Sequence, residues 1–165
     1  MRLIKLSLAM AILLVAPVLS AGGFHNLDGH DVNVNRRGIG ANGYDVVAYH
    51  IEEKARQGTP AISHDHEGVR YYFHNDENKS LFASDPEKYV PAFGGWCAFG
   101  VGMAFGQFEG WNPGKYQVDP ESFKIVEGRL MLFYKTEEID ALHEWNQAED
   151  ALLVSAEEHW KAMTK

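Results

Sequence analysis

Alternating apolar and polar side chains predict a β-hairpin near the middle of the chain. Residues 61–66 and 69–74 have the β-rich composition of strands, and Glu67-Gly68 between them suits a tight turn. Successive strand side chains point to opposite faces, so every second residue from Val69 onward would face the core. The apolar members of that set are Val69, Tyr71 and Phe73.

A second hairpin is predicted from residues 123–126 and 130–134, which flank another turn dipeptide, Glu127-Gly128. Residues 44–50 read Tyr-Asp-Val-Val-Ala-Tyr-His, and this β-branched and aromatic composition also predicts a strand. The β structure is therefore expected to be a small, mainly antiparallel sheet.

Apolar residues three and four positions apart predict helices. Asn75 or Asp76 can cap a helix that runs to about Ser84. Thr136 can cap a second helix from Glu137, with a break near residues 147–150. Its apolar stripe comprises Ile139, Leu142, Trp145, Leu152, Ala156, Trp160 and Met163. No internal repeat is visible, and the predicted fold is a single α+β domain with helices packed against the sheet.

The first 21 residues have the composition of a secretory signal peptide. Arg2 and Lys5 precede an apolar run over residues 6–19, and small residues follow it. The run is shorter than the roughly 20 residues that a membrane-spanning helix needs. We therefore expect a periplasmic or secreted protein with no stable membrane anchor after cleavage. We divide the remainder into an irregular arm (22–43), a main domain (44–135) and a C-terminal helical segment (136–165).

The charge and the cysteine content narrow the class of partner. A formal net charge of −8 argues against nucleic acid, because phosphate backbones repel an acidic protein. Cys97 is the single cysteine, although exported proteins usually pair their cysteines. This free thiol must therefore be buried and inert, bonded to another molecule, ligated to a metal, or reactive.

Cys97 ends a stretch with strong turn signals. Asp85-Pro86 is typical of a helix start, Pro91 disfavours helix at the residue before it, and Gly94-Gly95 permits a tight bend. If the chain carries chemistry, we expect it immediately after this bend.

Four runs in the sequence together resemble an exported YHS-domain protein. They are Tyr44-Asp-Val-Val-Ala-Tyr, Tyr71-Tyr-Phe-His-Asn-Asp-Glu-Asn, Leu81-Phe-Ala-Ser-Asp-Pro-Glu-Lys-Tyr-Val-Pro and Gly94-Gly-Trp-Cys-Ala. The resemblance implies a YHS-like fold over residues 44–135 and an association with metal handling, including copper transport. It also implies a functional Cys97, because some related proteins are expected to carry selenocysteine at this position.

The chain departs from the metal-binding members of that family. Ala48, His74 and Asn78 stand where those members carry cysteines. The thiolate site that the resemblance would imply is therefore absent, although His74 could still bind a metal.

Three functional hypotheses follow. In the first, Cys97, His74, His50 and Met103 bind a soft metal such as copper, because thiolate, imidazole and thioether ligands favour Cu(I). The partner would then be a metal ion or a metal-trafficking protein. In the second, Cys97 is the catalytic residue of a thiol-redox enzyme that needs an external resolving thiol. In the third, Cys97 is an inert buried residue of an interaction domain.

Other residues carry weaker signals. His64 and His66 would share a strand face at a spacing that can chelate a metal, but a solvated position beside the turn is the favoured interpretation. Several aromatic residues near Cys97 could wall a pocket, although we interpret them first as core. They are Trp96, Phe99, Phe105, Phe108 and Trp111.

Overall fold

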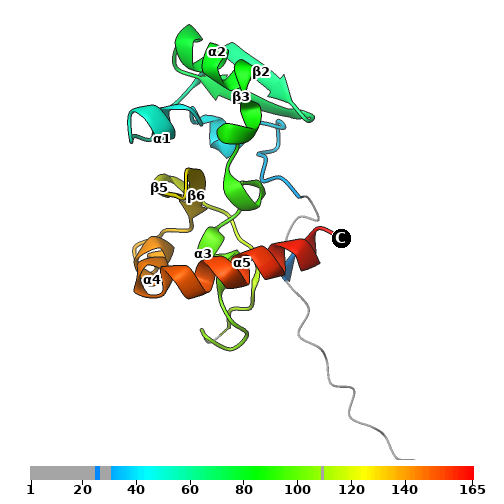
Figure 1. Ribbon diagram of the computed structural model, residues 1–165, viewed down its shortest axis with the longest axis vertical. Helices are drawn as coiled ribbons and strands as arrows, with labels where there is room; N and C mark the ends of the chain where they lie inside the picture. Colours follow the sequence, from blue (N-terminus) through cyan, green and yellow to red (C-terminus); the bar gives the residue numbers. More distant parts are fainter. Residues whose placement is uncertain (1–24, 27–30, 109) are drawn as a thin grey trace, which may run out of the picture.

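The strands form three short pairs, and the two longest pairs are the predicted hairpins (Figure 1). The computed structural model describes residues 25–26, 31–108 and 110–165, so the predicted signal peptide (1–21) lies outside the described residues. The antiparallel pairs are β2 (Thr59–His66) with β3 (Val69–Phe73) and β5 (Asp119–Val126) with β6 (Arg129–Phe133). The parallel pair is β1 (His25–Asn26) with β4 (Gly114–Lys115).

Helices surround these strands. The α-helices are α1 (Ala48–Ile51), α2 (Asp76–Ser84), α3 (Ala98–Gly102), α4 (Ala141–Gln147) and α5 (Glu149–Met163). The 3-10 helices are η1 (Ala41–Gly43), η2 (Pro86–Lys88) and η3 (Ala92–Gly95). Across the described part of the chain, no helix has the length and apolarity needed to cross a membrane. The predicted α+β single domain is confirmed.

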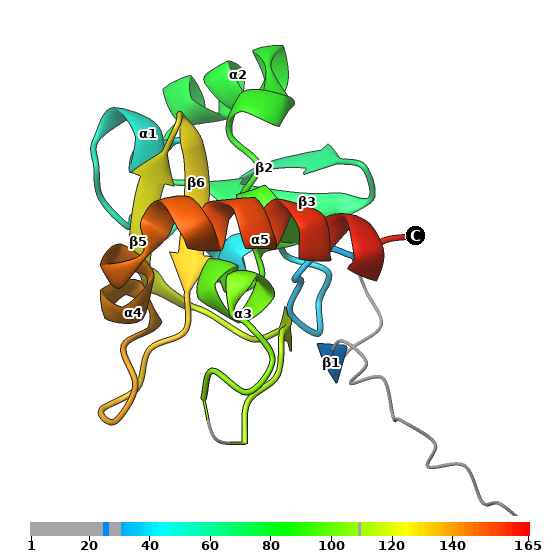
Figure 2. The ribbon, with the colours of Figure 1, turned by 60° about the horizontal axis from the view of Figure 1, so that its bottom comes forward.

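Helix α5 runs along one side of the molecule and crosses α3 (Figures 1 and 2). The crossing is close because Gly102 of α3 has no side chain. A Cβ at this position would lie 2.6 Å from the carbonyl oxygen of Leu152 and 3.3 Å from the Cβ of Ala156. In α5, Leu152 and Ala156 are the buried members of the predicted apolar stripe.

The buried side chains fall into two clusters. One lies between the β2–β3 hairpin and α2, and its largest members include Tyr49, Phe73 and Phe82. The other lies between β6 and helices α3, α4 and α5, and its largest members include Trp96 and Trp145. Cys97 belongs to the second cluster.

Helix ends follow the local hydrogen bonding. The Asn75 side chain accepts a hydrogen bond from the Asn78 amide at 2.7 Å, which confirms the predicted start of α2. The predicted helix start at Glu137 is wrong, because the Asp140 side chain caps α4 four residues later than Thr136 would. The predicted break is confirmed, since α4 ends at Gln147 and α5 begins at Glu149.

The predicted strand over residues 44–50 is wrong, because residues 48–51 form α1. The Asp45 Oδ1 atom accepts hydrogen bonds from the amides of Val47 (3.0 Å) and Ala48 (3.3 Å), which starts a helical turn despite the β-branched composition. His50 therefore lies on a short helix. Within the predicted irregular arm, Val34 bridges Gly40, and Ile39 bridges Arg70 of β3.

The structure also shows an internal repeat, which the sequence analysis did not find. Both hairpins have an eight-residue strand with proline in second place, a register shift and a Glu-Gly turn, followed by a five-residue strand. The turn angles agree, with φ of 48° and 80° at Glu67-Gly68 and 50° and 76° at Glu127-Gly128. Equivalent hairpin residues stand 60 positions apart, as in Pro60 and Pro120.

Candidate functional site

A left-handed bend positions Cys97. Phe93, Gly94 and Gly95 have φ of 52°, 60° and 79°, a conformation that costs little only for glycine. A Cβ on Gly94 would collide with the backbone of Asp31, so this position requires glycine. The chain leaves the bend with Cys97 at the N-cap of α3.

The Cys97 sulfur lies at the start of α3 and accepts two backbone hydrogen bonds. Its Sγ atom is 3.2 Å from the Tyr134 amide nitrogen and 3.4 Å from that of Gly100. Cys97 is 2 % exposed, and this burial raises the pKa of the thiol, while the amides of Tyr134 and Gly100 oppose the increase. The thiol is therefore protonated near neutral pH.

Cys97 nevertheless lines a cavity of about 230 Å³, which we call the Cys97 pocket. Its principal lining residues are Cys97, Phe99, Phe108, Trp111, Tyr134 and Glu144. Three of the five aromatic residues singled out in the sequence thus face the pocket. Trp96 instead lines a separate cavity, and Phe105 is 47 % exposed.

The other predicted metal ligands do not join Cys97 in this pocket. Met103 is fully buried and caps the opposite end of α3, which places the two backbones about 9 Å apart along the helix axis. His50 packs edge-on against Tyr89 at 5.3 Å in the other core cluster. Burial, with a smaller effect from Lys88, lowers the pKa of His50.

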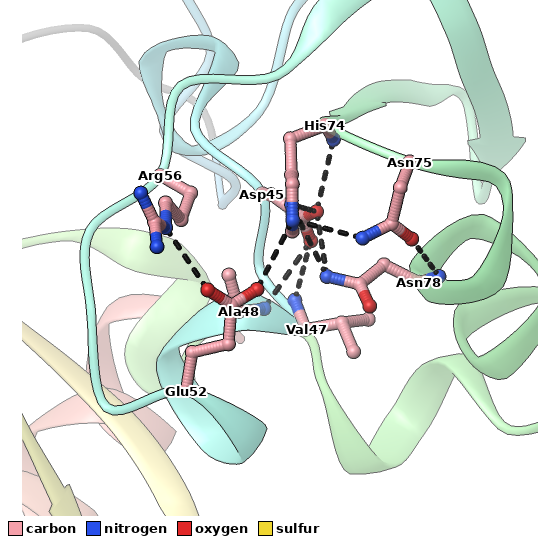
Figure 3. A network of polar contacts seen from close by, with 8 residues as sticks. All are labelled: Asp45, Val47, Ala48, Glu52, Arg56, His74, Asn75 and Asn78. Atoms are coloured by element: carbon pink, nitrogen blue, oxygen red, sulfur yellow. Dashed lines mark hydrogen bonds and ion pairs between the residues drawn. The ribbon is translucent and has the colours of Figure 1, made fainter.

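His74 lies in a different polar network, centred on Asp45 (Figure 3). Asp45 is fully buried, and its Oδ2 atom lies 2.6 Å from His74 Nδ1 and accepts hydrogen bonds from the His74 amide (3.0 Å) and the Asn78 side chain (2.9 Å). The other ring nitrogen, Nε2, lies 3.1 Å from Glu52, which also pairs with Arg56 at 2.9 Å. Both His74 nitrogens are therefore already engaged.

The predicted set of Cys97, His74 and His50 is not assembled. Within the described residues, one group of three His, Cys or carboxylate side chains brings its ligand atoms within 4.8 Å of one another, and that group is His66, Glu67 and Glu87. Both glutamates are exposed, and His66 Nε2 pairs with Glu87 at 2.9 Å. We interpret this group as a surface ion pair beside a turn.

The Asp45 network and the Cys97 pocket occupy equivalent places in the repeat. Asp45 follows a left-handed bend at residues 41–43, as Cys97 follows the bend at residues 93–95. The Asp45 amide donates to the Arg56 carbonyl (2.8 Å), and the Cys97 amide donates to the Tyr116 carbonyl (3.0 Å), 60 positions further on. Each side chain also caps its short helix.

The hairpins complete this equivalence. The His74 amide, which follows β3, donates to Asp45, and the Tyr134 amide, which follows β6, donates to the Cys97 sulfur. We therefore distinguish a first unit (residues 41–74) and a second unit (residues 93–134). In the first unit, polar side chains surround the Asp45 carboxyl group. In the second unit, the equivalent residue is Cys97, which lines the Cys97 pocket.

Sequence reasoning missed Asp45 and Tyr134 as parts of these sites. The signal that could have found them is the common spacing of Gln57-Gly-Thr-Pro and Gln117-Val-Asp-Pro, and of Glu67-Gly68 and Glu127-Gly128. The three positions at which the resemblance led us to expect cysteines lie together, since Ala48, His74 and Asn78 all contact Asp45.

Comparison of the chain with protein-family models, curated proteins and solved structures finds no match. The resemblance to YHS domains therefore remains a prediction from the sequence motifs.

Proposed function

We propose that this chain is an exported binding module of the YHS kind, which carries a soft metal ion, copper(I), as cargo at the Cys97 thiol. The observation that carries the proposal is that Cys97 lines a cavity of about 230 Å³. A thiol kept only for packing needs no such space beside it.

The surroundings of the sulfur favour a cation. Among the described residues, the pocket lining includes Glu138, Asp140 and Glu144 but no lysine, arginine or histidine. Ring faces also attract cations, and thiolate is the preferred ligand of soft metals. The backbone amides of Gly100 and Tyr134 would stabilise the thiolate that forms when a metal displaces the proton.

This site differs from the four-residue set expected from the sequence. The metal contact is reduced to one sulfur, so a bound ion would keep coordination positions open to other ligands. An ion held in this way can pass to a partner by ligand exchange, which suits transfer to a metal-trafficking protein. The raised pKa of the Cys97 thiol disfavours the thiolate that a redox enzyme and a metal site both need, but a metal ion can displace the proton as it binds.

The test is anaerobic titration of the purified, reduced protein with Cu(I) in competition with a chromophoric chelator. We expect one equivalent to bind to the wild type and this binding to be lost in Cys97→Ser. The controls are Met103→Leu and His50→Gln, which change residues outside the Cys97 pocket and should leave the affinity unchanged. Wild-type affinity in Cys97→Ser would exclude the proposal, and loss of binding in Met103→Leu would restore the thioether to the site.

A further inference from the structure

We propose that the Cys97 pocket also accepts a small substituted ammonium ion, held by its aromatic walls and its acidic rim. This inference rests on the proposed function only for the location of the site. Copper would be held by sulfur, whereas an ammonium ion would be held by ring faces and carboxylates. The two ligands can therefore be tested separately.

The walls of the pocket are four aromatic rings arranged as two corners. Phe99 and Phe108 meet edge to face at 5.3 Å with an interplanar angle of 80°. Trp111 and Tyr134 meet at 5.6 Å and 62°. In each of these edge-to-face pairs one ring face is covered by the edge of its neighbour, and the faces that stay open to the cavity can attract a quaternary ammonium group.

The Trp111 ring is supported from behind before any ligand arrives. Tyr116 stacks on Trp111 at 4.6 Å with an angle of 27°, and it is not among the residues that line the pocket. The Tyr116 hydroxyl donates to the Asn112 carbonyl at 2.8 Å. A wall that is already ordered loses little conformational entropy on binding.

The rim carries negative charge that the protein only partly neutralises. Lys135 pairs with Asp140 at 2.9 Å. Glu138 and Glu144 also line the pocket, and neither has a side-chain hydrogen bond or ion pair within the described part of the chain. Anions are therefore disfavoured, while a cation gains from both the carboxylates and the rings.

The volume and the apolar walls distinguish among cations. A cavity of 150 Å³ accommodates benzene, so about 230 Å³ suits a ligand of roughly six to ten non-hydrogen atoms. Potassium or sodium would lose its hydration shell to rings that offer no replacement oxygens. An alkylammonium ion instead buries its methyl groups against the rings, which is favourable in itself.

The experiment compares choline with its uncharged isostere 3,3-dimethyl-1-butanol by calorimetric titration of the full protein, at constant ionic strength. We expect choline to bind about tenfold or more tightly than the alcohol, and potassium chloride to give no heat of binding. Trp111→Leu should weaken choline binding about tenfold, Trp111→Phe less, and Glu144→Gln several-fold. Circular dichroism and thermal midpoints establish that each variant is folded.

Matched controls change the same residue types outside the pocket. Phe105→Leu and Glu137→Gln alter an exposed ring and an exposed carboxylate that do not line the pocket, and both should bind choline as the wild type does. Cys97→Ser should retain choline binding even though it loses Cu(I). Equal affinity for choline and the alcohol, no saturable binding up to about 50 mM, or insensitivity to both Trp111→Leu and Glu144→Gln would each overturn the inference.

Discussion

Removal of the Asp45 carboxyl group should cost this protein a large part of its stability. The two carboxyl oxygens interact with five nitrogen donors, namely the amides of Val47, Ala48 and His74 and the side chains of His74 and Asn78. Val47, Ala48 and Asn78 are almost completely buried, so their donors have no ready access to bulk water. In Asp45→Ala the Val47 amide and the Asn78 side chain lose this acceptor, whereas the Ala48 amide keeps the Asp45 carbonyl oxygen at 3.2 Å.

The size of the effect follows from the two donors of Val47 and Asn78. An unsatisfied buried donor costs about 1–3 kcal/mol, so the loss should be about 4 kcal/mol, from a typical total of about 5–15 kcal/mol. With a denaturant dependence of about 2 kcal/mol per molar urea, the unfolding midpoint should fall by about 2 M. Asp45→Asn retains one oxygen and the side-chain shape, so its unfolding midpoint should lie between those of the wild type and Asp45→Ala.

Urea unfolding followed by tryptophan fluorescence measures this shift. The matched control is Asp65→Ala, which removes a carboxyl group of the same type that pairs with Arg70 at 2.7 Å and 2.8 Å on the surface. Its unfolding midpoint should stay close to the wild-type value, because exposed ion pairs contribute little. Equal midpoints for Asp45→Ala and Asp65→Ala would show that the Asp45 network is not the structural element described here.

Three further predictions concern the bends, the thiol and the repeat. Gly94→Ala should lower the thermal midpoint much more than Gly68→Ala, because both residues have positive φ but only Gly94 lacks space for a Cβ; equal losses would contradict this account. Burial raises the pKa of Cys97 in the folded protein, so folding favours the protonated thiol. This contribution to stability is complete below the pKa of the unfolded state, and it is lost as the pH rises through the pKa of the folded state. The stability of the wild type relative to Cys97→Ser, from urea unfolding at several pH values, should therefore decline above about pH 8.5 and not change below it. Cys97→Asp should destabilise the protein by burying an unpaired charge, and adding Tyr134→His should recover part of the lost urea unfolding midpoint. A double variant no more stable than Cys97→Asp alone would argue against the equivalence of the two sites.

The hairpins and α2 could be predicted because their signals are local. Alternation of apolar residues and the Glu67-Gly68 and Glu127-Gly128 turns identify the paired strands without long-range information. The Asn75 cap is local in the same way. Helix α1 was missed because its residues favour strands, and the capping bonds of Asp45 override that preference.

The candidate site was harder to predict because long-range contacts determine it. The nature of Cys97 as a lone thiol after a glycine bend is visible in the sequence, but no spacing shows whether His74 reaches it. The structure places His74 beside Asp45 instead. The repeat was hidden for a related reason: Cys97 and Tyr134 differ chemically from Asp45 and His74, while the backbone hydrogen bonds around them are conserved between the two units.

The repeat gives a physical reason for the proposed role of the Cys97 thiol as a binding group. In the first unit, three backbone amides donate hydrogen bonds to the Asp45 side chain, which is a carboxylate when ionised. In the second unit the corresponding amides of Gly100 and Tyr134 point at a neutral sulfur, for which they are weaker partners. These donors become fully effective only when Cys97 loses its proton, because hydrogen bonds to a charged acceptor are about twice as strong. A soft metal that displaces this proton would therefore leave a negatively charged sulfur, which the amides of Gly100 and Tyr134 can stabilise as the equivalent amides of the first unit can stabilise a carboxylate.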